Sequence, residues 1–548
     1  MDDNSQADEI LKRFDDLASK RGIWEKHWEE VALKVLPYYS TSFYAQGNMT
    51  PGVKRNQEQY DITANSALWK FSAAMESMLT PAGSKWHRLR CTNPDLMKIR
   101  DVAIWFDTVN DLMFHYRGSP NSNFQSQQHD GYVSIGAFGT SSLFIDQLDA
   151  RYGKGLRYRH VHLGELFFAA NHQGIIDTVY RRFKMTLRQI AQKWGKEKMP
   201  DTLISKLETK PEEEIQVIHC VRPNDDYEQG NLTKRGMKFE SYYVLKDTRT
   251  MMAEEGYKSF PYAIARYLTA PGELYGRSPA MNVLPSIQVL NEEKKIILKQ
   301  GHRTVDPVLL AHDDGILDGF SLKPGAINAG GVSADGRPLV HALPTGNLAV
   351  GKDMMDDERM AINDAFLVTL FQILVETPQM TATEVLERAR EKGALLSPTM
   401  GRFQSESIGP MIMREFDLLA QQRLLPPPPQ VLIEAKGEWK AEYDSPLNRA
   451  MRSEEAAGIQ RSMAWASEVA AQTQDPSVMD WFDIDQILPE MVDINGGKAK
   501  YVRSPDAVAQ IRQGRQQQQA VQQLTDALPG IAGLTKTLAP QGGGVITK

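Results

Sequence analysis

The feature that most constrains this chain is the stretch AFLVTLFQILV at 365–375, in which only Thr369 and Gln372 are polar. A helix at a protein surface keeps a polar face, so a helical segment that is apolar nearly all round must be covered on most sides. The stretch is also too short to span a bilayer, which takes about 20 apolar residues. Two explanations remain open from the residues alone. Either the stretch lies in the centre of a large core, or neighbouring copies of the same chain cover it.

Length and charge narrow the class of protein further. The 548 residues exceed what one simple core organises, so we expect several regions or domains. A net charge of -6, from 63 basic and 69 acidic residues, argues against binding nucleic acid by general electrostatic attraction. It does not exclude a protein that encloses DNA without gripping it. The acidic, polar start MDDNSQADEI is no signal peptide, and we expect a soluble protein made in a cytoplasm.

Apolar periodicity predicts an α+β chain that is mainly helical. Alternating apolar residues and glycines predict strands and turns from about 130 to 270, with a short helix near 185–195. Prolines at 398 and 410 predict kinks in a long helix that opens at the capping box of Thr381 and Glu384. The expected helical segments are 7–36, 60–81, 95–117, 284–301, 353–376 and 445–525.

No segment carries a readable catalytic signature. A phosphate-binding P-loop and a nucleophile elbow are both missing, and GYVSIGAFG resembles a dinucleotide loop only loosely. Cys91 and Cys220 are too far apart to suggest a disulfide framework. His160 and His162 alternate without completing a metal-ligand set, and we interpret them as a polar strand face. The acidic residues of 475–493 fit an ordinary amphipathic helix. We therefore predict no catalytic residue, no metal site and no cofactor.

The helix at 284–301 has a charged cluster with two explanations. Lys294, Lys295 and Lys299 stand beside Glu292 and Glu293. The first explanation is a solvated helix face. The second is a face lining a water-filled channel, where the three lysines are candidate contacts to the lumen or to DNA phosphates.

Several segments resemble the portal, or head-to-tail connector, proteins of short-tailed double-stranded DNA phages. The most specific is TPQMTATEVLERAREKGALLSPTMGRFQSESIGPMIMREFDLLAQQRLLPPPP at 377–429. YDITANSALWKFSAAMESMLTPAGSKWHRL, YGRSPAMNVLPSIQVLN and YVRSPDAVAQIRQGRQQQQ resemble the family's entry segment, the approach to its first stem helix and its C-terminal helices. These blocks follow the family's order from about residue 60 to 520, so the resemblance covers most of the chain.

The resemblance implies a portal-type subunit that assembles as a ring around a DNA channel. Its parts would be a wing at 1–277, stem helices at 278–304 and 351–376, a small α/β clip at 305–350, a channel loop at 377–381, a long kinked helix returning to the wing at 382–444, a helical crown at 445–525 and a flexible tail at 526–548. A ring would also account for the apolar stretch. Each stem helix would touch a neighbour on two sides, through Phe366, Leu367, Leu370, Phe371 and Leu374.

The function implied by the resemblance is the passive conduction of DNA through a channel, and not catalysis. The ring would occupy one capsid vertex of the virion and pass double-stranded DNA during packaging and ejection. Implied partners are copies of the chain itself in a ring of about twelve subunits, the terminase large subunit, tail adaptor proteins, and capsid and scaffolding proteins, with no membrane. The channel loop would comprise Thr377, Pro378, Gln379, Met380 and Thr381. The alternatives are another virion component of the tail or scaffold, and a phage DNA-processing enzyme.

Overall fold

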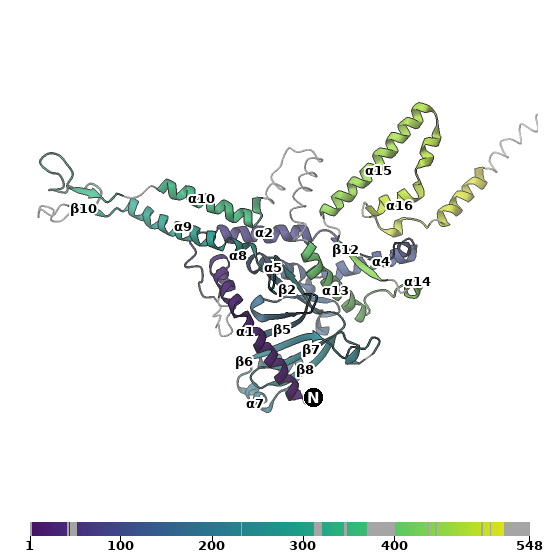
Figure 1. Cartoon of the computed structure of the whole chain (residues 1–548), viewed down its shortest axis with the longest axis horizontal. Helices are drawn as coiled ribbons and strands as arrows, with labels where there is room; N and C mark the ends of the chain where they lie inside the picture. The colour runs from purple at the N-terminus through teal and green to yellow at the C-terminus, as the bar shows by residue number, and fades with distance from the viewer. Residues whose placement is uncertain are drawn as a thin grey trace, which may run out of the picture. The chain divides into compact units, whose positions relative to one another are not determined.

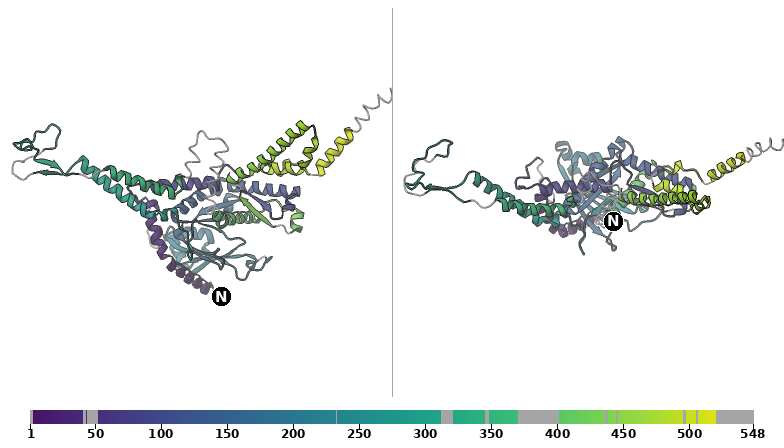
Figure 2. Two further views of the ribbon diagram at one scale, coloured as in Figure 1. Left: turned by 45° about the horizontal axis from the view of Figure 1, so that its top comes forward. Right: turned by 90° about the horizontal axis from the view of Figure 1, so that it is seen from above.

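A computed structural model describes residues 3–40, 43, 52–231, 233–311, 321–344, 348–369, 401–435, 438–443, 446–494, 497–504 and 506–519. The chain is mixed α+β and mainly helical, as predicted (Figures 1 and 2). It divides into two compact units. The first contains residues 1–86 and 113–425, and the second contains residues 87–112 and 426–548.

The first unit is organised by an antiparallel five-stranded sheet of order β4-β5-β6-β7-β8. Helix α1 (Asp3–Val35) packs on one face of it, and Ile10 and Phe14 contact Tyr180 and Tyr242 in a buried cluster. The predicted periodicity of this helix is confirmed, and the helix ends just before Pro37. The five strands are β4 (Leu166–Ala170), β5 (Ile176–Thr186), β6 (Glu214–Pro223), β7 (Phe239–Leu245) and β8 (Thr250–Tyr257).

The opposite face of this sheet is covered by two short helices, α6 (Leu187–Trp194) and α7 (Asp201–Thr209). Leu187 and Leu203 pack there on Val217 and Leu245. Because successive side chains of a strand point to opposite faces, both faces of β6 and β7 are apolar. The short helix expected near 185–195 is α6, which begins with a capping box formed by Thr186 and Gln189.

A second sheet, of order β3-β2-β9, lies beside helices α5 and α13. Its strands are β2 (Thr140–Gln147), β3 (Leu156–His160) and β9 (Tyr262–Arg266). Helix α13 (Gly409–Gln421) follows a π-helical segment at Gln404–Ile408. Pro410 lacks an N–H and its ring crowds the preceding turn, so the irregularity expected at this proline is present in this form. Pro398 lies outside the described residues.

Helix α5 (Phe124–Phe138) corrects the prediction of strands and turns near residue 130. Its glycines made it look like a loop, but they serve close packing. A Cβ at Gly136 would overlap with the Leu68 side chain of α2 (Thr63–Leu79). The helix is buried on most sides, so it lacks the polar face that identifies a surface helix in a sequence.

A paired-helix segment completes the first unit. Helix α9 (Leu284–Val305) follows the short α8 (Pro279–Asn282) and lies alongside α10 (Leu348–Ala365). Between the two helices in sequence, β10 (Leu309–Ala311) pairs with β11 (Val340–Ala342) at the far end of the pair (Figure 1). The two helices are therefore joined by a long segment that contains a small two-stranded sheet, and not by a short turn.

The predicted helix at 353–376 is interrupted. Helix α10 ends at Ala365, and Leu367 has φ +58°. Phe366 turns into the unit and packs edge-on against the ring of Phe71 at 6.2 Å, with none of its surface exposed. A left-handed leucine costs about 1–2 kcal/mol, which the burial of a phenylalanine side chain offsets.

The second unit has a two-stranded sheet, in which β1 (His87–Cys91) pairs with β12 (Trp439–Tyr443). Inside this unit, Trp105 Nε1 donates a hydrogen bond to the carbonyl of Pro426 at 3.0 Å. Helix α4 passes from the second unit into the first. The helices are α3 (Pro94–Met97), α4 (Arg100–Arg117), α14 (Gln430–Glu434), α15 (Pro446–Thr473), α16 (Ile484–Ile494) and a further helix at 506–519.

None of the described helices is long and apolar enough to cross a lipid bilayer.

A buried ion pair joins the end of α4 to α13. Glu415 accepts hydrogen bonds from Arg117 Nε at 3.1 Å and from the Tyr158 hydroxyl at 2.7 Å. Arg117 and Glu415 are almost fully buried, and the guanidinium lies 4.6 Å from the centre of the Trp86 ring. The ring contact and the second hydrogen bond satisfy charges that would otherwise be costly inside the unit.

We predict that Glu415→Gln lowers the stability of the chain by about 3 kcal/mol, because it leaves Arg117 buried without a counter-charge. The double variant Arg117→Met with Glu415→Leu should lose less than the single variant, since no isolated charge remains. Thermal unfolding of both variants checks this. A double variant less stable than Glu415→Gln would contradict it.

Candidate functional site

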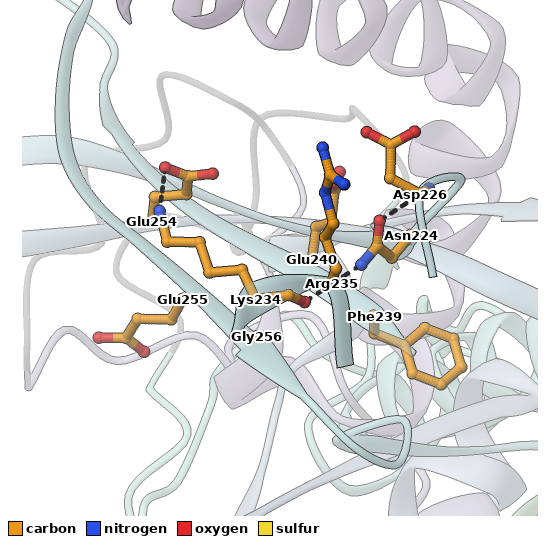
Figure 3. Close-up of a pocket in the computed structure, with 9 residues that line it drawn as sticks. All are labelled: Asn224, Asp226, Lys234, Arg235, Phe239, Glu240, Glu254, Glu255 and Gly256. Carbon is orange, nitrogen blue, oxygen red and sulfur yellow. Dashed lines mark hydrogen bonds and ion pairs between the residues drawn. The ribbon is translucent and has the colours of Figure 1, made fainter. Parts of the chain in front are cut away.

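Figure 3 shows a shallow hollow beside β7 and β8, with a volume of about 150 Å³. Several of its charges are paired locally. Lys234 forms an ion pair with Glu254, and Asn224 donates to the Lys234 carbonyl at 3.3 Å and accepts from the Asp226 N–H at 3.0 Å. Side chains that satisfy one another across a small hollow stabilise a loop. They give no reason to assign a ligand.

The two cysteines singled out in the sequence are buried, and the two histidines are half-buried. The interpretation of His160 and His162 as one polar strand face is wrong, because only His160 lies in β3 and His162 caps the short 3-10 helix that follows it. Burial lowers the pKa of His160 to about 4, and burial followed by the charges of His160 and Arg21 lowers that of His162 to about 3. The ring of His162 stacks on Tyr39 at 5.4 Å. Burial raises the pKa of the Cys220 thiol to about 12. Among the described residues, no group of three or more His, Cys, Asp or Glu is placed to hold a metal.

The segment that leads into α9 is anchored by a close approach of two backbone strands. Gly139 ends α5 with φ +74°, and a Cβ at either Gly139 or Gly276 would overlap with the backbone of the other. The Gly276 N–H donates to Thr140 Oγ1, and Ser278 Oγ donates to the Ala137 carbonyl, both at 2.8 Å. Only glycine permits this approach, so the direction of α8 and α9 is set by α5 and β2.

A second anchor ties α9 and α10 to one loop. The buried Asn291 of α9 accepts a hydrogen bond from the Tyr60 N–H at 2.7 Å and donates to the Glu58 carbonyl at 2.9 Å. From α10, Arg359 pairs with Asp61 at 2.8 Å. Both helices are therefore fastened to the same short stretch of chain just before α2.

The electrostatics of Asp61 follow from this anchor. Burial acts to raise the pKa of its carboxyl, but hydrogen bonds from Thr63 and Arg359 together outweigh burial and hold the pKa below the ordinary 3.8. Asp61 is thus charged in the folded chain over the whole neutral range, and its charge supports the junction of α9 and α10.

The contact between α9 and α10 is close but not electrostatically favourable. A Cβ at Gly351 would lie 2.8 Å from Cδ1 of Ile297, so the two helices approach tightly there. Nearby, burial and then the charge of Glu358 raise the pKa of Glu293. No ion pair joins α9 to α10 among the residues that the structure describes. Packing, and not charge, holds the pair together.

The far part of the pair exposes many apolar side chains. Val305 at the end of α9 is 88% exposed, and Ile327 between the β10 and β11 strands is 96% exposed. Large exposed apolar groups mark surfaces that meet another macromolecule when they gather on one segment. The other exposed large apolar residues of this segment are Val289, Ile296, Leu298, Val308, Leu310, Leu322, Val332, Leu343, Val350, Met354 and Met360.

Of the five residues expected to pack between subunits, the structure describes Phe366 and Leu367. Phe366 is buried by its own chain, which corresponds to the core explanation of the apolar stretch, and Leu367 is only partly exposed. Leu370, Phe371 and Leu374 lie outside the described residues, as does the expected channel loop at 377–381. The exposed apolar residues described above lie on α9, on α10 and on the β10–β11 segment between them, which we call the tip.

The three candidate lysines do not share one surface. Lys295 and Lys299 are one helical turn apart and lie on the same side of α9, whereas Lys294 lies on an adjacent side. Lys295 approaches Glu292 at 3.4 Å, a weak pair at the surface. Neither Lys294 nor Lys299 forms an ion pair with an acidic residue among the described residues.

Sequence reasoning missed the anchors, although traces of them were present. The glycines of GAFGTSS and YGRSP, and Asn291 on the apolar face of its helix, are the residues that fix α9. A polar amide on the inner face of a helix signals a backbone partner. Its partner at residues 58–61 is distant in sequence, so the signal alone did not identify it.

Comparison with known proteins relates the chain to a family of bacteriophage proteins. The family model for "Bacteriophage head to tail connecting protein" matches residues 7–502. The chain is 32% identical over 531 residues to the "Probable portal protein" of Bordetella phage BPP-1, covering 94% of this chain and 92% of that protein. It is 26% identical over 522 residues to the "Portal protein" of Salmonella phage epsilon15, with the same coverage.

We predict that Gly276→Ala destabilises the first unit, because the new methyl group would overlap with the Gly139 backbone. Gly301→Ala in α9 is the matched control, since nothing lies within 4 Å of its Cβ position and alanine favours a helix by about 1 kcal/mol. Thermal unfolding should show a lower midpoint for the first variant and an equal or higher one for the second. Equal midpoints for both variants would contradict the anchor.

Asp61→Asn should lower thermal stability at neutral pH, and the loss should disappear in acid. The pKa of Asp61 in the folded chain lies below its ordinary 3.8, so its contribution is present above pH 3.8 and is lost as pH falls through the folded value. Unfolding midpoints of both proteins between pH 7 and pH 3 measure this. The exposed Glu208→Gln is the control, and a pH-independent difference for Asp61→Asn would count against the anchor.

Proposed function

Because this chain belongs to the bacteriophage head-to-tail connecting protein family, we propose that it forms the ring through which DNA enters and leaves the capsid. It is a portal protein, a structural component of the virion at the head–tail junction and not an enzyme. The family implies a ring oligomer that links head and tail. The finer proposal concerns which parts of the chain conduct DNA and which receive partners.

The observation that carries the proposal is the family match, which runs through both units and includes α9, β10, β11 and α10. The exposed apolar side chains of these elements support it. A ring uses one heterologous contact repeated until it closes, so every subunit presents two different surfaces to its neighbours. A helix pair whose apolar residues are not covered by its own chain is suited to that arrangement.

In this proposal the parts of the chain have separate roles. Residues 1–277 form the wing, 278–304 and 351–376 form the stem, and 305–350 form the clip, which docks the terminase large subunit and later the tail adaptor proteins. Residues 382–444 return to the wing, and 445–525 form the crown. The loop at 377–381 contacts DNA in the channel. Capsid and scaffolding proteins meet the ring at the vertex during assembly in the host cytoplasm.

The overall charge suits a conduit. Every basic contact to a phosphate adds affinity and releases counter-ions, so a channel through which DNA slides should hold few of them. The net charge of -6 is consistent with weak, averaged contact. In this proposal the chemistry of DNA movement belongs to the terminase, and this chain supplies the passage and the docking surface.

We predict that the purified chain assembles into rings of roughly 0.7 MDa, the mass of about twelve copies of 61.6 kDa. Size-exclusion chromatography with light scattering gives the mass, and electron microscopy along the ring axis shows the hole. A hole wide enough for duplex DNA separates a portal from another tail or scaffold component. A monomer at all concentrations and in assembled particles would overturn the proposal.

A further inference from the structure

Helices α9 and α10 carry opposite net charge. Helix α9 has four basic and two acidic residues, and α10 has five acidic and two basic residues. Oppositely charged helices that lie side by side would normally pair across their contact. Here the described residues form no such pair, and the acidic residues Glu293 and Glu358 face each other instead. The complementary charges are therefore left for a different contact.

The charges gather in one stripe on each helix. On α9, Lys295, Lys299 and Arg303 follow one another at intervals of four residues. At 3.6 residues per turn they lie about 120–160° around the helix from Ile297, the residue that meets α10.

The acidic stripe of α10 has the same relation to its own contact residue. Asp353, Asp357 and Asp364 lie about 120–160° around α10 from Gly351, which meets Ile297. All three aspartates are exposed. The basic stripe thus points away from α10 and the acidic stripe points away from α9, so the pair presents opposite charge on its two outer edges.

Apolar side chains accompany both stripes. Val289 and Ile296 flank the basic stripe, and Val350, Met354 and Met360 flank the acidic one, each between 46% and 59% exposed. A face that served only for solvation would not need them. Glu292 also lies on the α9 edge, where it pairs with Lys295 at 3.4 Å, so Lys299 and Arg303 carry the net basic charge of that edge. A mixture of apolar groups and a net charge of opposite sign on the two edges is what a protein–protein contact requires.

We infer that the basic edge of α9 docks on the acidic edge of α10 in the next copy of this chain. The inference rests on the proposed ring and names the residues of its stem contact. Lys299 and Arg303 of one subunit face Asp353 and Asp357 of its neighbour, and the flanking apolar residues close around them. Because the two edges differ, the contact is head to tail and repeats around a ring.

This assignment differs from the expected role of Lys295 and Lys299 as contacts to DNA. A lysine in the stem contact is paired with a carboxylate and is not available to a phosphate. Of the three candidate lysines, only Lys294 lies off this edge. The two roles are separable by experiment, because one acts on assembly and the other on DNA in rings that have already assembled.

The test uses two full-length charge-reversal variants, purified separately. Variant A carries Lys299→Glu and Arg303→Glu, and variant B carries Asp353→Lys and Asp357→Lys. In each variant alone, every stem contact sets like charges against each other, which should raise the concentration for half-assembly about tenfold or more over the wild-type chain. In an equal mixture, alternating A and B subunits restore opposite charges at every contact.

The expected result is assembly of the mixture into rings that contain A and B in equal numbers, measured by light scattering and native mass spectrometry. Lys196→Glu with Lys198→Glu, and Glu197→Lys with Glu208→Lys, change net charge equally on exposed positions elsewhere and should assemble as the wild type does. Circular dichroism of each variant verifies folding.

Three outcomes would overturn the inference. The first is that A and B each assemble alone as readily as the wild type. The second is that the mixture does no better than either variant. The third is that A assembles normally but its particles package less DNA, which would place the basic edge in the channel. Failure of the wild-type chain itself to form rings would instead overturn the proposed function, and the two failures are thus distinguishable.

Discussion

The close approach of Gly139 and Gly276 is the contact on which the rest of the molecule depends. It brings the chain that leads into α9 against the end of α5, where no side chain fits between the two backbones. Hydrogen bonds from Gly276 to Thr140 and from Ser278 to Ala137 complete the junction. Everything after residue 276 that forms the helix pair and its tip takes its direction from this place. A long helix pair can transmit force or hold a fixed angle in an assembly only when its base is rigid.

The anchor formed by Asn291, Asp61 and Arg359 also fixes the direction of the helix pair, through the loop before α2. It fastens α9 and α10 to one loop, so the two helices are fixed as a pair and not singly. Farther along, the pair is held by close packing alone, and its charges and many apolar side chains face outward. The base of the pair is thus hydrogen-bonded and buried, whereas its outer part leaves apolar and charged side chains exposed. Such a division is typical of a subunit whose exposed part is covered by neighbouring subunits in an assembly. The ring that the family implies would supply the missing cover through a repeated contact.

The rest of the first unit has the opposite character. Its two sheets are covered by α1, α6, α7, α5 and α13, and His162, Arg117 and Cys220 pack there among aromatic rings. Such residues attract attention in a sequence because enzymes use them. Here burial lowers the pKa of His162 to about 3 and raises the pKa of the Cys220 thiol to about 12, so the imidazole is neutral and the thiol protonated, which suits a scaffold. The membership of the chain in the head-to-tail connecting protein family leads to the same conclusion.

The sequence by itself determined the fold class, most of the helices and strands, the charge balance and the family. These properties follow from local periodicity and from ordered blocks of residues, and neither depends on distant contacts. It did not predict α5, the stacking of His162 on Tyr39, or the break after Ala365. Each of these was decided by residues far away in the chain: Leu68 against Gly136, Tyr39 against His162, and Phe71 against Phe366. The apolar stretch at 365–375 shows why these features depend on distant residues. Its composition demanded cover, but only the tertiary structure decided that Phe366 is covered by its own chain while the edges of α9 and α10 are left open, because burial is a property of the neighbours that folding brings together.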